Sequence, residues 1–284
     1  MNAIDVKSFA QEWRNDIKTR IANYSCAPKL LVISIGVPDD ASQVYVNNKL
    51  KVASEVGIQA KHIVLGGDYK LSEYCHLVEE LSKGHDGVII QKPAVVADYA
   101  FETIAESIPV YADVDCLTDG NAGRLFKGSP LFKPATVEGV IKLLRHECGD
   151  LSGVSVAMLG RSNIVGRPMA ACLEHEGATV TLYHSKSVGV EVELRRYDVV
   201  ITATGRANSI HWNMLSAGAT VIDVGINRVN GKLCGDFNPE ITEGFWAEVY
   251  AKNIRYTPVP NGVGLLTTTA LMDNVLTAWE LQHC

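Results

Sequence analysis

The sequence lacks the features that mark membrane, secreted and zinc-binding proteins. No uninterrupted apolar run approaches the roughly 18 residues of a membrane-spanning helix. Residues 1–16 include acidic side chains and show no basic stretch followed by an apolar one, so no secretory signal is expected. The seven cysteines form no CxxC pair and no Cys/His cluster of zinc spacing. We therefore expect a cytoplasmic protein with reduced thiols, no membrane contact and no metal site.

The chain also lacks a strong excess of charge of either sign. Its 26 Lys and Arg residues against 32 Asp and Glu residues give a net charge of −6, which argues against a nucleic-acid partner. Hydrophobic residues make up 47% of the 284 residues and charged residues 20%, a balance typical of soluble globular proteins. A chain of this length favours one large domain or two ordinary ones.

The clearest local pattern lies in residues 151–187. A short apolar strand at 154–159 leads into the turn GRSNIVG (160–166), then a helix, then a second strand at 178–183. Ser162 is expected to be the N-cap of the helix, because its hydroxyl can accept a hydrogen bond from a free backbone N–H group. Such a βαβ unit presents N–H groups and a helix N-terminus to a phosphate. It therefore predicts a dinucleotide-binding domain of the Rossmann type.

The residue types in this unit favour NADP over NAD. The glycine spacing GxSxxxG (160–166) differs from the usual GxGxxG, so an ordinary tight turn is the alternative on this stretch alone. An NAD site usually carries Asp or Glu at the end of the second strand, where it holds the ribose 2′-hydroxyl. Here that strand ends in YHSK (183–186). Arg161, whose planar guanidinium suits a phosphate, and Ser185 are expected to hold the 2′-phosphate instead.

The rest of the chain alternates between helix and strand patterns, as is typical of α/β folds. We expect helices over 6–21, 41–56, 72–83, 97–107, 137–147 and 267–279, and strands over 29–36, 60–65, 86–91, 198–203 and 219–224. A loop rich in Asp, Gly and Asn is expected over 112–130. The predicted architecture is two α/β domains with an active-site cleft between them. Residues 1–135, joined by the terminal helix 264–284, form one domain, and residues 136–263 form the dinucleotide-binding domain.

Outside this unit, several polar residues stand where a site could form. Tyr45 and Lys49 are four residues apart on a predicted helix and share a face, with Ser42 about one turn earlier. Gln91 follows an apolar strand, at its carboxyl end. The acidic pair in 113–115 could bind a metal, but no third ligand of suitable spacing is evident. Taken singly, each has a plain alternative: a solvated helix face, a loop-capping amide, and surface acids.

In combination, these segments resemble the FolD family of bifunctional methylenetetrahydrofolate dehydrogenase/methenyltetrahydrofolate cyclohydrolases. The resemblance extends from the second predicted helix to the last. The motifs that carry it are YVNNKLK (45–51), GVIIQKP (87–93), DVDCLTDGNAG (113–123), GRSNIVGRPM (160–169), ATVTLYHSKS (178–187), VIDVGIN (221–227) and TPVPNGVGLLT (257–267).

The resemblance implies a reaction and the residues that carry it out. Methylenetetrahydrofolate would be oxidised with NADP to the methenyl compound, which would then be hydrolysed to 10-formyltetrahydrofolate in one-carbon metabolism and purine biosynthesis. Lys49 resembles the family's catalytic lysine, and Tyr45 the aromatic residue that stacks on the pterin. Gln91 resembles the glutamine that bonds to that lysine, and Asp115 the aspartate that anchors the pterin. Ser42 and Thr267 are also expected beside the substrate.

The same resemblance implies a cofactor site and an assembly. Arg161 and Ser185 match the contacts to the 2′-phosphate of NADP. The other residues expected to line the cofactor are Gly160, Ser162, Thr204, Gly225 and Ile226. A cytoplasmic homodimer is expected, with tetrahydrofolate derivatives as its small-molecule substrates.

The chain departs from the usual family motifs in places that touch the substrate. Cys116 replaces the glycine of DVDG, and it would be strained if that position needs a positive φ. Lys92 replaces the leucine of QLP, which places a cation near the site. Asn261 and Leu265 replace a glycine and a proline in PGGVGPMT. Three alternative functions remain: a dehydrogenase without the cyclohydrolase step, a catalytically silent NADP-binding protein, or an unrelated two-domain dehydrogenase of a small acid or amino acid.

Overall fold

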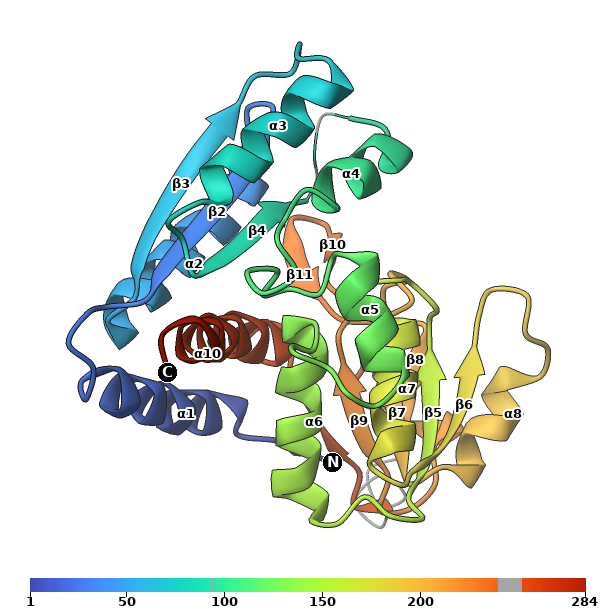
Figure 1. Cartoon of the computed structure of the whole chain (residues 1–284). Coiled ribbons are helices and arrows are strands. Elements are labelled where there is room, and N and C mark those ends of the chain that lie inside the picture. Colours follow the sequence, from blue (N-terminus) through green and yellow to red (C-terminus); the bar gives the residue numbers. More distant parts are fainter. Residues whose placement is uncertain (93, 95, 240–251) are drawn as a thin grey trace. The chain divides into compact units, whose positions relative to one another are not determined.

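The chain folds into two compact units, each described below by itself. The structure is a computed structural model that describes residues 1–92, 94, 96–239 and 252–284 (Figure 1). Unit 1 contains Met1–Ala10 and Thr136–Thr267, and unit 2 contains Gln11–Ala135 and Thr268–Cys284. These units differ from the expected boundaries at the N-terminus. Residues 1–10 belong with unit 1 because β1 (Asn2–Ala3) pairs in parallel with β13 (Arg255–Tyr256).

Unit 2 is built on a parallel three-stranded sheet. The strands are β2 (Lys29–Ile35), β3 (Gln59–Leu65) and β4 (Gly87–Gln91), in the order β3-β2-β4. Alternate residues of the sheet face one side and pack with α3 and α4 in a core cluster that includes Leu31, Ile33, Tyr74, Val78 and Phe101. The helices that contribute to this unit are α1 (Val6–Ile21), α2 (Asp40–Val56), α3 (Leu71–Ser82), α4 (Asp98–Ala105), α5 (Asp119–Phe126) and α10 (Val263–His283).

Local signals set the ends of α2, the helix that carries two of the expected site residues. Asp39 is the N-cap, and its carboxylate accepts a hydrogen bond of 2.8 Å from the backbone N–H of Ser42. Gly57 ends the helix with a φ of 95°, a left-handed conformation that glycine adopts at little cost. The spacing of Tyr45 and Lys49 therefore lies within one regular helix.

The expectation of a loop over 112–130 is wrong in its second half, because α5 forms there. Thr118 caps this helix by accepting a hydrogen bond of 3.3 Å from the N–H of Asn121. Asn121 is fully buried, and its amide donates to the carbonyl of Val110 at 2.9 Å. Two glycines weaken the helical pattern of DGNAGRLF. Tertiary hydrogen bonds of this kind therefore stabilise the helix.

Unit 1 contains a parallel six-stranded sheet in the order β1-β13-β9-β7-β5-β6. Its longer strands are β5 (Ser155–Leu159), β6 (Thr179–Tyr183), β7 (Val199–Thr202) and β9 (Thr220–Asp223). The other elements are α6 (Ala135–Cys148), α7 (Gly166–His175), α8 (Val190–Glu193), the short pair β8 (Ile210–His211) and β12 (Phe237–Asn238), and the hairpin β10 (Asn227–Val229) and β11 (Lys232–Cys234). From β5 the chain moves first to β6 and then across to β7. The carboxyl ends of β5 and β7 therefore form the switch point at which such sheets bind ligands.

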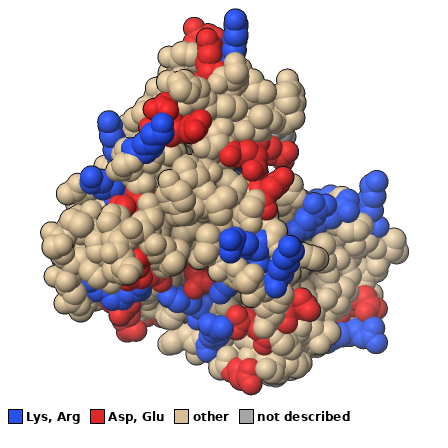
Figure 2. Space-filling view, viewed as in Figure 1, with Lys and Arg blue, Asp and Glu red and all other residues tan. Residues whose placement is uncertain are grey.

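These two units confirm the predicted class of two α/β domains, and the dinucleotide-binding type of sheet lies in unit 1. Among the described residues, no helix has the length and apolar character needed to cross a membrane. Figure 2 shows Lys and Arg side chains interspersed with Asp and Glu side chains on the face in view, with no continuous basic field.

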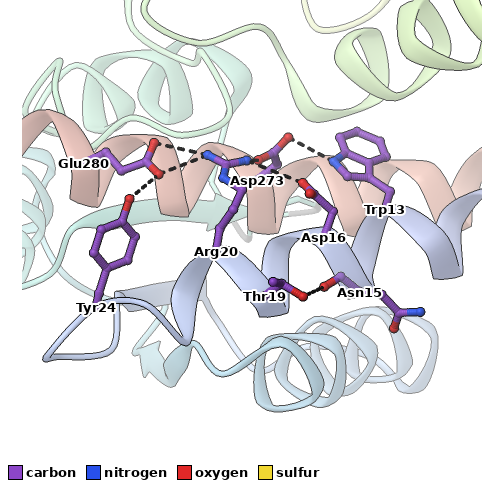
Figure 3. Close-up of polar contacts among 8 residues, drawn as sticks. All are labelled: Trp13, Asn15, Asp16, Thr19, Arg20, Tyr24, Asp273 and Glu280. Atoms are coloured by element: carbon purple, nitrogen blue, oxygen red, sulfur yellow. Dashed lines mark hydrogen bonds and ion pairs between the residues drawn. The ribbon is translucent and has the colours of Figure 1, made fainter.

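Helix α10 is tied to α1 within unit 2 by a polar network (Figure 3). The indole N–H of Trp13 donates to Asp273 at 3.0 Å, and the guanidinium of Arg20 donates to the same carboxylate at 2.8 Å. Arg20 also pairs with Glu280 at 3.1 Å, and the hydroxyl of Tyr24 donates to Glu280 at 2.9 Å. Each carboxylate thus has two donors, so the partly buried charges are compensated.

Candidate active site

Lys49 and Gln91 meet at the carboxyl end of the unit 2 sheet. The ammonium of Lys49, on α2, donates a hydrogen bond to the side-chain oxygen of Gln91, the last residue of β4. The Gln91 amide nitrogen donates to the carbonyl of Lys92, which leaves the amide oxygen to face the lysine. Burial lowers the pKa of Lys49, and the charge of Asp115 opposes this change. The lysine is therefore closer to giving up its proton than an exposed lysine.

Asp115 completes this group from the loop that precedes α5. Its carboxylate accepts a hydrogen bond of 3.0 Å from the backbone N–H of Ala135. Burial raises the pKa of Asp115 to about 6, although the Ala135 N–H and the charge of Lys49 both lower it. An acid and a base with shifted pKa values thus act on each other within unit 2, an arrangement that is common in catalytic sites.

Tyr45 and Ser42 accompany Lys49 on α2. The Tyr45 side chain is exposed to 46%, one turn before Lys49, so its ring is accessible for stacking. Ser42 is buried, with 4% of its surface exposed.

Asp113 is not a surface acid, so that simple alternative is wrong for it. The residue is fully buried, and its carboxylate accepts hydrogen bonds from the N–H groups of Leu117 and Thr118 at 2.8 and 2.9 Å. The hydroxyl of Thr118 and the amide of Asn121 also donate to it, at 2.7 and 2.9 Å. Asp113 therefore fixes the turn that presents Asp115.

Asn274, on α10, is a further positioning residue that the sequence did not reveal. Its buried amide donates to the carbonyl oxygens of Val114 and Lys133, at 2.8 and 2.9 Å. Val114 precedes Asp115, and Lys133 lies two residues before Ala135. One amide therefore joins the segment that carries the Asp115 carboxylate to the segment that carries its N–H donor.

The departures from the family motifs have distinct structural outcomes. Cys116 has a φ of 58°, so this position does require the left-handed conformation, and cysteine is strained there. Asn261 has a φ of 72°, which asparagine tolerates better than most residues. The Lys92 ammonium lies 4.1 Å from the centroid of the Phe101 ring. This cation–π contact gives the extra positive charge of Lys92 a partner.

Thr267 belongs to unit 1, near the start of α10. Its hydroxyl lies 3.0 Å from the hydroxyl of Thr136 and donates at 3.2 Å to the carbonyl of Val263. Within the part of the chain that the structure describes, no group of three or more His, Cys, Asp or Glu residues could hold a metal ion.

A pocket of about 370 Å³ lies at the switch point of the unit 1 sheet. It is lined by four of the residues expected to bind the cofactor, namely Gly160, Arg161, Ser185 and Thr204. Gly225, Ile226 and Ser162 are not among its lining residues. The prediction that Ser162 is the N-cap is wrong, because α7 begins at Gly166 and its N-cap is Val165. The Ser162 hydroxyl instead accepts from the N–H of Val165 at 3.2 Å and so braces the turn.

The walls of this pocket fit a dinucleotide. Gly160 has a φ of 116°, and a Cβ atom there would lie 2.4 Å from the carbonyl oxygen of Ala203, so only glycine allows this close turn. The hydroxyl of Ser209 is buried without a hydrogen-bond partner in the described structure, and it lines the pocket. A buried polar group of this kind calls for a ligand atom. Arg206 and Glu191 also line the pocket, and sequence reasoning missed both.

Two buried carboxylates hold the loops beside the pocket. Asp236 accepts hydrogen bonds from the N–H of Thr204 at 2.6 Å, the N–H of Arg206 at 3.1 Å and the amide of Asn227 at 2.9 Å. It thereby joins the loop after β7 to the start of β10. Asp223 accepts from the N–H of Gly225 at 2.9 Å, and burial raises the pKa of Asp223 to about 6. The expected cofactor residues in these loops are thus held by the protein itself.

The sequence matches two family models along most of its length. Residues 4–115 match the catalytic domain of tetrahydrofolate dehydrogenase/cyclohydrolase, and residues 134–283 match the NAD(P)-binding domain of the same enzyme. The chain belongs to this family.

Individual members of the tetrahydrofolate dehydrogenase/cyclohydrolase family are similar over nearly the whole chain. "Bifunctional protein FolD 1" of Acinetobacter baylyi is 38% identical, over 99% of this chain and 95% of its own length. "Bifunctional protein FolD" of Lactobacillus delbrueckii subsp. bulgaricus is 37% identical, over 99% and 98%.

Solved structures of the family have the same fold. The FolD enzyme of Campylobacter jejuni is 34% identical, with a TM-score of 0.87 and 99% of each chain covered. The FolD of Trypanosoma brucei, which was solved with NADP and an inhibitor, is 29% identical, with a TM-score of 0.87 over 99% of this chain and 97% of that one.

Proposed function

We propose that this chain catalyses both reactions of its family. It oxidises 5,10-methylenetetrahydrofolate to the methenyl compound with NADP, and it hydrolyses the methenyl compound to 10-formyltetrahydrofolate. The observation that carries the proposal is the group of Lys49, Gln91 and Asp115, which three separate segments of unit 2 bring together. Family membership supplies the substrate class, and the geometry supports the roles of the residues.

Asp115 and Tyr45 are proposed to bind and orient the pterin. The ionised carboxylate of Asp115 would accept hydrogen bonds from the amino and ring N–H groups of the pterin. The exposed ring of Tyr45 would stack on its face, and Ser42 and Thr267 remain proposed contacts of the substrate. These contacts fix the position of the carbon that reacts, which is the main requirement of the first step.

Lys49 is proposed to move the proton in the second step. Addition of water to the methenyl carbon forms a C–O bond and releases one proton. The C–N bond at N5 then breaks as N5 takes up a proton and the hydroxyl group of the adduct loses one, which leaves the formyl group on N10. An amine whose pKa is lowered by burial can accept the proton of the attacking water and release it again. The oxygen of Gln91 holds the amine in place and adds no competing charge.

Gly160, Arg161, Ser185 and Thr204 are proposed to hold NADP in the unit 1 pocket. Ser162, Gly225 and Ile226 remain proposed contacts through their loops. Bound NADP would supply the acceptor for the hydride of the substrate. Arg161 would contribute a charge-assisted contact to the 2′-phosphate, and Ser185 a neutral one.

A homodimer in the cytoplasm belongs to the same proposal, because the resemblance to the family implies both. The functional division into a folate-binding part (1–135 with 264–284) and an NADP-binding part (136–263) is also part of this proposal. Light scattering after size-exclusion chromatography tests the dimer.

One spectrophotometric experiment tests the function. Methylenetetrahydrofolate is supplied with NADP or with NAD, and the formation and decay of the methenyl absorbance are followed. Methenyltetrahydrofolate is then supplied alone. We expect oxidation with NADP and hydrolysis without any cofactor. Oxidation without hydrolysis would leave a dehydrogenase only, and the absence of both would refute the proposal.

A further inference from the structure

The pocket proposed for NADP has an acidic residue in its wall. Glu191 lies on α8 and lines the pocket together with Arg161 and Ser185. Its side chain is exposed and forms no hydrogen bond or ion pair with another residue in the described part of the chain. No Asp or Glu stands at the carboxyl end of β6, but α8, the next helix along the chain, contributes the carboxylate of Glu191 to the pocket wall.

A carboxylate in this position acts oppositely on the two nicotinamide cofactors. It repels the 2′-phosphate of NADP, because like charges at close range are unfavourable. With NAD it can accept a hydrogen bond from the free ribose 2′-hydroxyl, the role that Asp or Glu plays in NAD-specific sites. Arg161 acts in the other direction, because its guanidinium favours the phosphate. The relative strength of the Glu191 and Arg161 interactions therefore sets the preference between NADP and NAD.

We propose that Glu191 is a specificity-determining residue that narrows the preference for NADP over NAD. The proposal rests on the proposed function, since it assigns this pocket to the cofactor. NADP stays preferred because Arg161 and Arg206 both line the pocket against one carboxylate. Because of Glu191, the protein binds NAD more readily than it would with Arg161 and Ser185 alone.

Glu193 provides a matched control on the same helix. It carries the same charge, but it pairs with Arg196 at 2.8 Å and does not line the pocket. A general change in surface charge would act through either glutamate. A specific effect on the ribose would act through Glu191 alone.

Binding of nucleotide fragments provides a readout that does not depend on turnover. The probes are 2′,5′-ADP, which carries the 2′-phosphate, and 5′-AMP, which carries the hydroxyl. Each is titrated by calorimetry into the wild type, Glu191→Gln and Glu193→Gln. We expect Glu191→Gln to increase the affinity ratio of 2′,5′-ADP to 5′-AMP by about three- to fivefold, the scale of one exposed charge interaction. The increase should shrink at about 1 M salt, where charges are screened within about 3 Å.

Steady-state kinetics with both cofactors complete the test. The ratio of kcat/KM for NADP to that for NAD should rise in Glu191→Gln and stay unchanged in Glu193→Gln. A ratio that is unchanged in Glu191→Gln, or that rises equally in Glu193→Gln, overturns the proposal. So does a wild type that binds neither probe. A wild type that binds both probes without oxidising the folate refutes the proposed function, and the calorimetric ratios then still decide the role of Glu191.

Discussion

Replacement of Lys49 by methionine tests the proposed proton transfer most directly. Methionine keeps an unbranched side chain on α2 and removes the amine that donates to Gln91. The neighbouring Lys51 is exposed on the same helix and lies two residues away, so it faces another direction. Lys51→Met is therefore the matched control for the loss of one positive charge from α2.

The size of the effect follows from what the amine contributes. A positioned acid or base accelerates a reaction by about 10²–10⁴-fold, which corresponds to about 2.7–5.4 kcal/mol at 1.36 kcal/mol per factor of ten. The charge of Lys49 also lowers the pKa of Asp115. Its loss should therefore raise that pKa further above about 6 and weaken substrate binding near neutral pH. Turnover and Michaelis constant must be measured separately.

The assay follows methenyl absorbance at saturating substrate for each half-reaction. In Lys49→Met we expect cyclohydrolase turnover to fall by at least about 100-fold. Dehydrogenase turnover should fall less, because hydride transfer depends on geometry more than on a proton carrier, so the methenyl product should accumulate. Lys51→Met should match the wild type in both assays. If Lys49→Met retains wild-type cyclohydrolase turnover, the lysine does not carry the proton and the mechanism is wrong.

Four further predictions address the remaining parts of the two sites. Arg161→Ala should raise the KM for NADP at least about tenfold, since a charged hydrogen bond is worth roughly 1.5–3 kcal/mol; an equal rise for NAD would contradict a 2′-phosphate contact. Only ionised Asp115 can accept the pterin N–H groups. Because its pKa is raised to about 6, the KM for the substrate should rise as the pH falls through that value. Asp115→Ala should weaken both half-reactions and lose this pH dependence. A wild-type KM that stays constant across this range would rule out a pterin contact by ionised Asp115. Cys116→Gly should raise the free energy of unfolding by about 1 kcal/mol in urea denaturation, because the φ of 58° suits glycine better; a loss of stability would show that the sulfur contributes more than the strain costs. Asn274→Ala leaves two carbonyl groups without their donor and should raise substrate KM several-fold without changing NADP affinity in calorimetry, whereas a shift in both would indicate general destabilisation.

Much of the fold was predictable because its signals are local. The apolar runs of β2, β4, β5 and β7 and the glycines at helix ends mark the order of elements well. The four-residue spacing puts Tyr45 and Lys49 on one helix face, and the place of Gln91 after a buried strand puts it at the carboxyl end of that strand. The contact between Lys49 and Gln91 was implied only by the resemblance to the family, and the structure contains it. The sequence pattern left open whether Cys116 needs a left-handed conformation, and its φ of 58° answers that question.

The missed features depend on contacts between distant segments. Helix α5 has weak local propensity, and buried hydrogen bonds from Asn121 support it. Asp113 and Asp115 are two residues apart and look alike in sequence, yet one braces a turn and the other faces Lys49. Glu191 reaches the cofactor pocket only through the path of the chain after β6. No periodicity or motif carries such information, because each depends on which segments meet in space.

The division of α10 between the two units has a consequence for the order in which the protein folds on the ribosome. Unit 2 begins at Gln11, but it also needs Thr268–Cys284, whose buried side chains include Leu271, Val275 and Trp279. All segments of unit 1 have been synthesised by residue 267. Unit 2 is therefore completed last, although its long first segment is synthesised before most of unit 1. Until then the nascent chain exposes the apolar surface of unit 2 that α10 will cover. A fragment that ends at residue 135 would keep that exposure permanently and would have no amide to align Asp115.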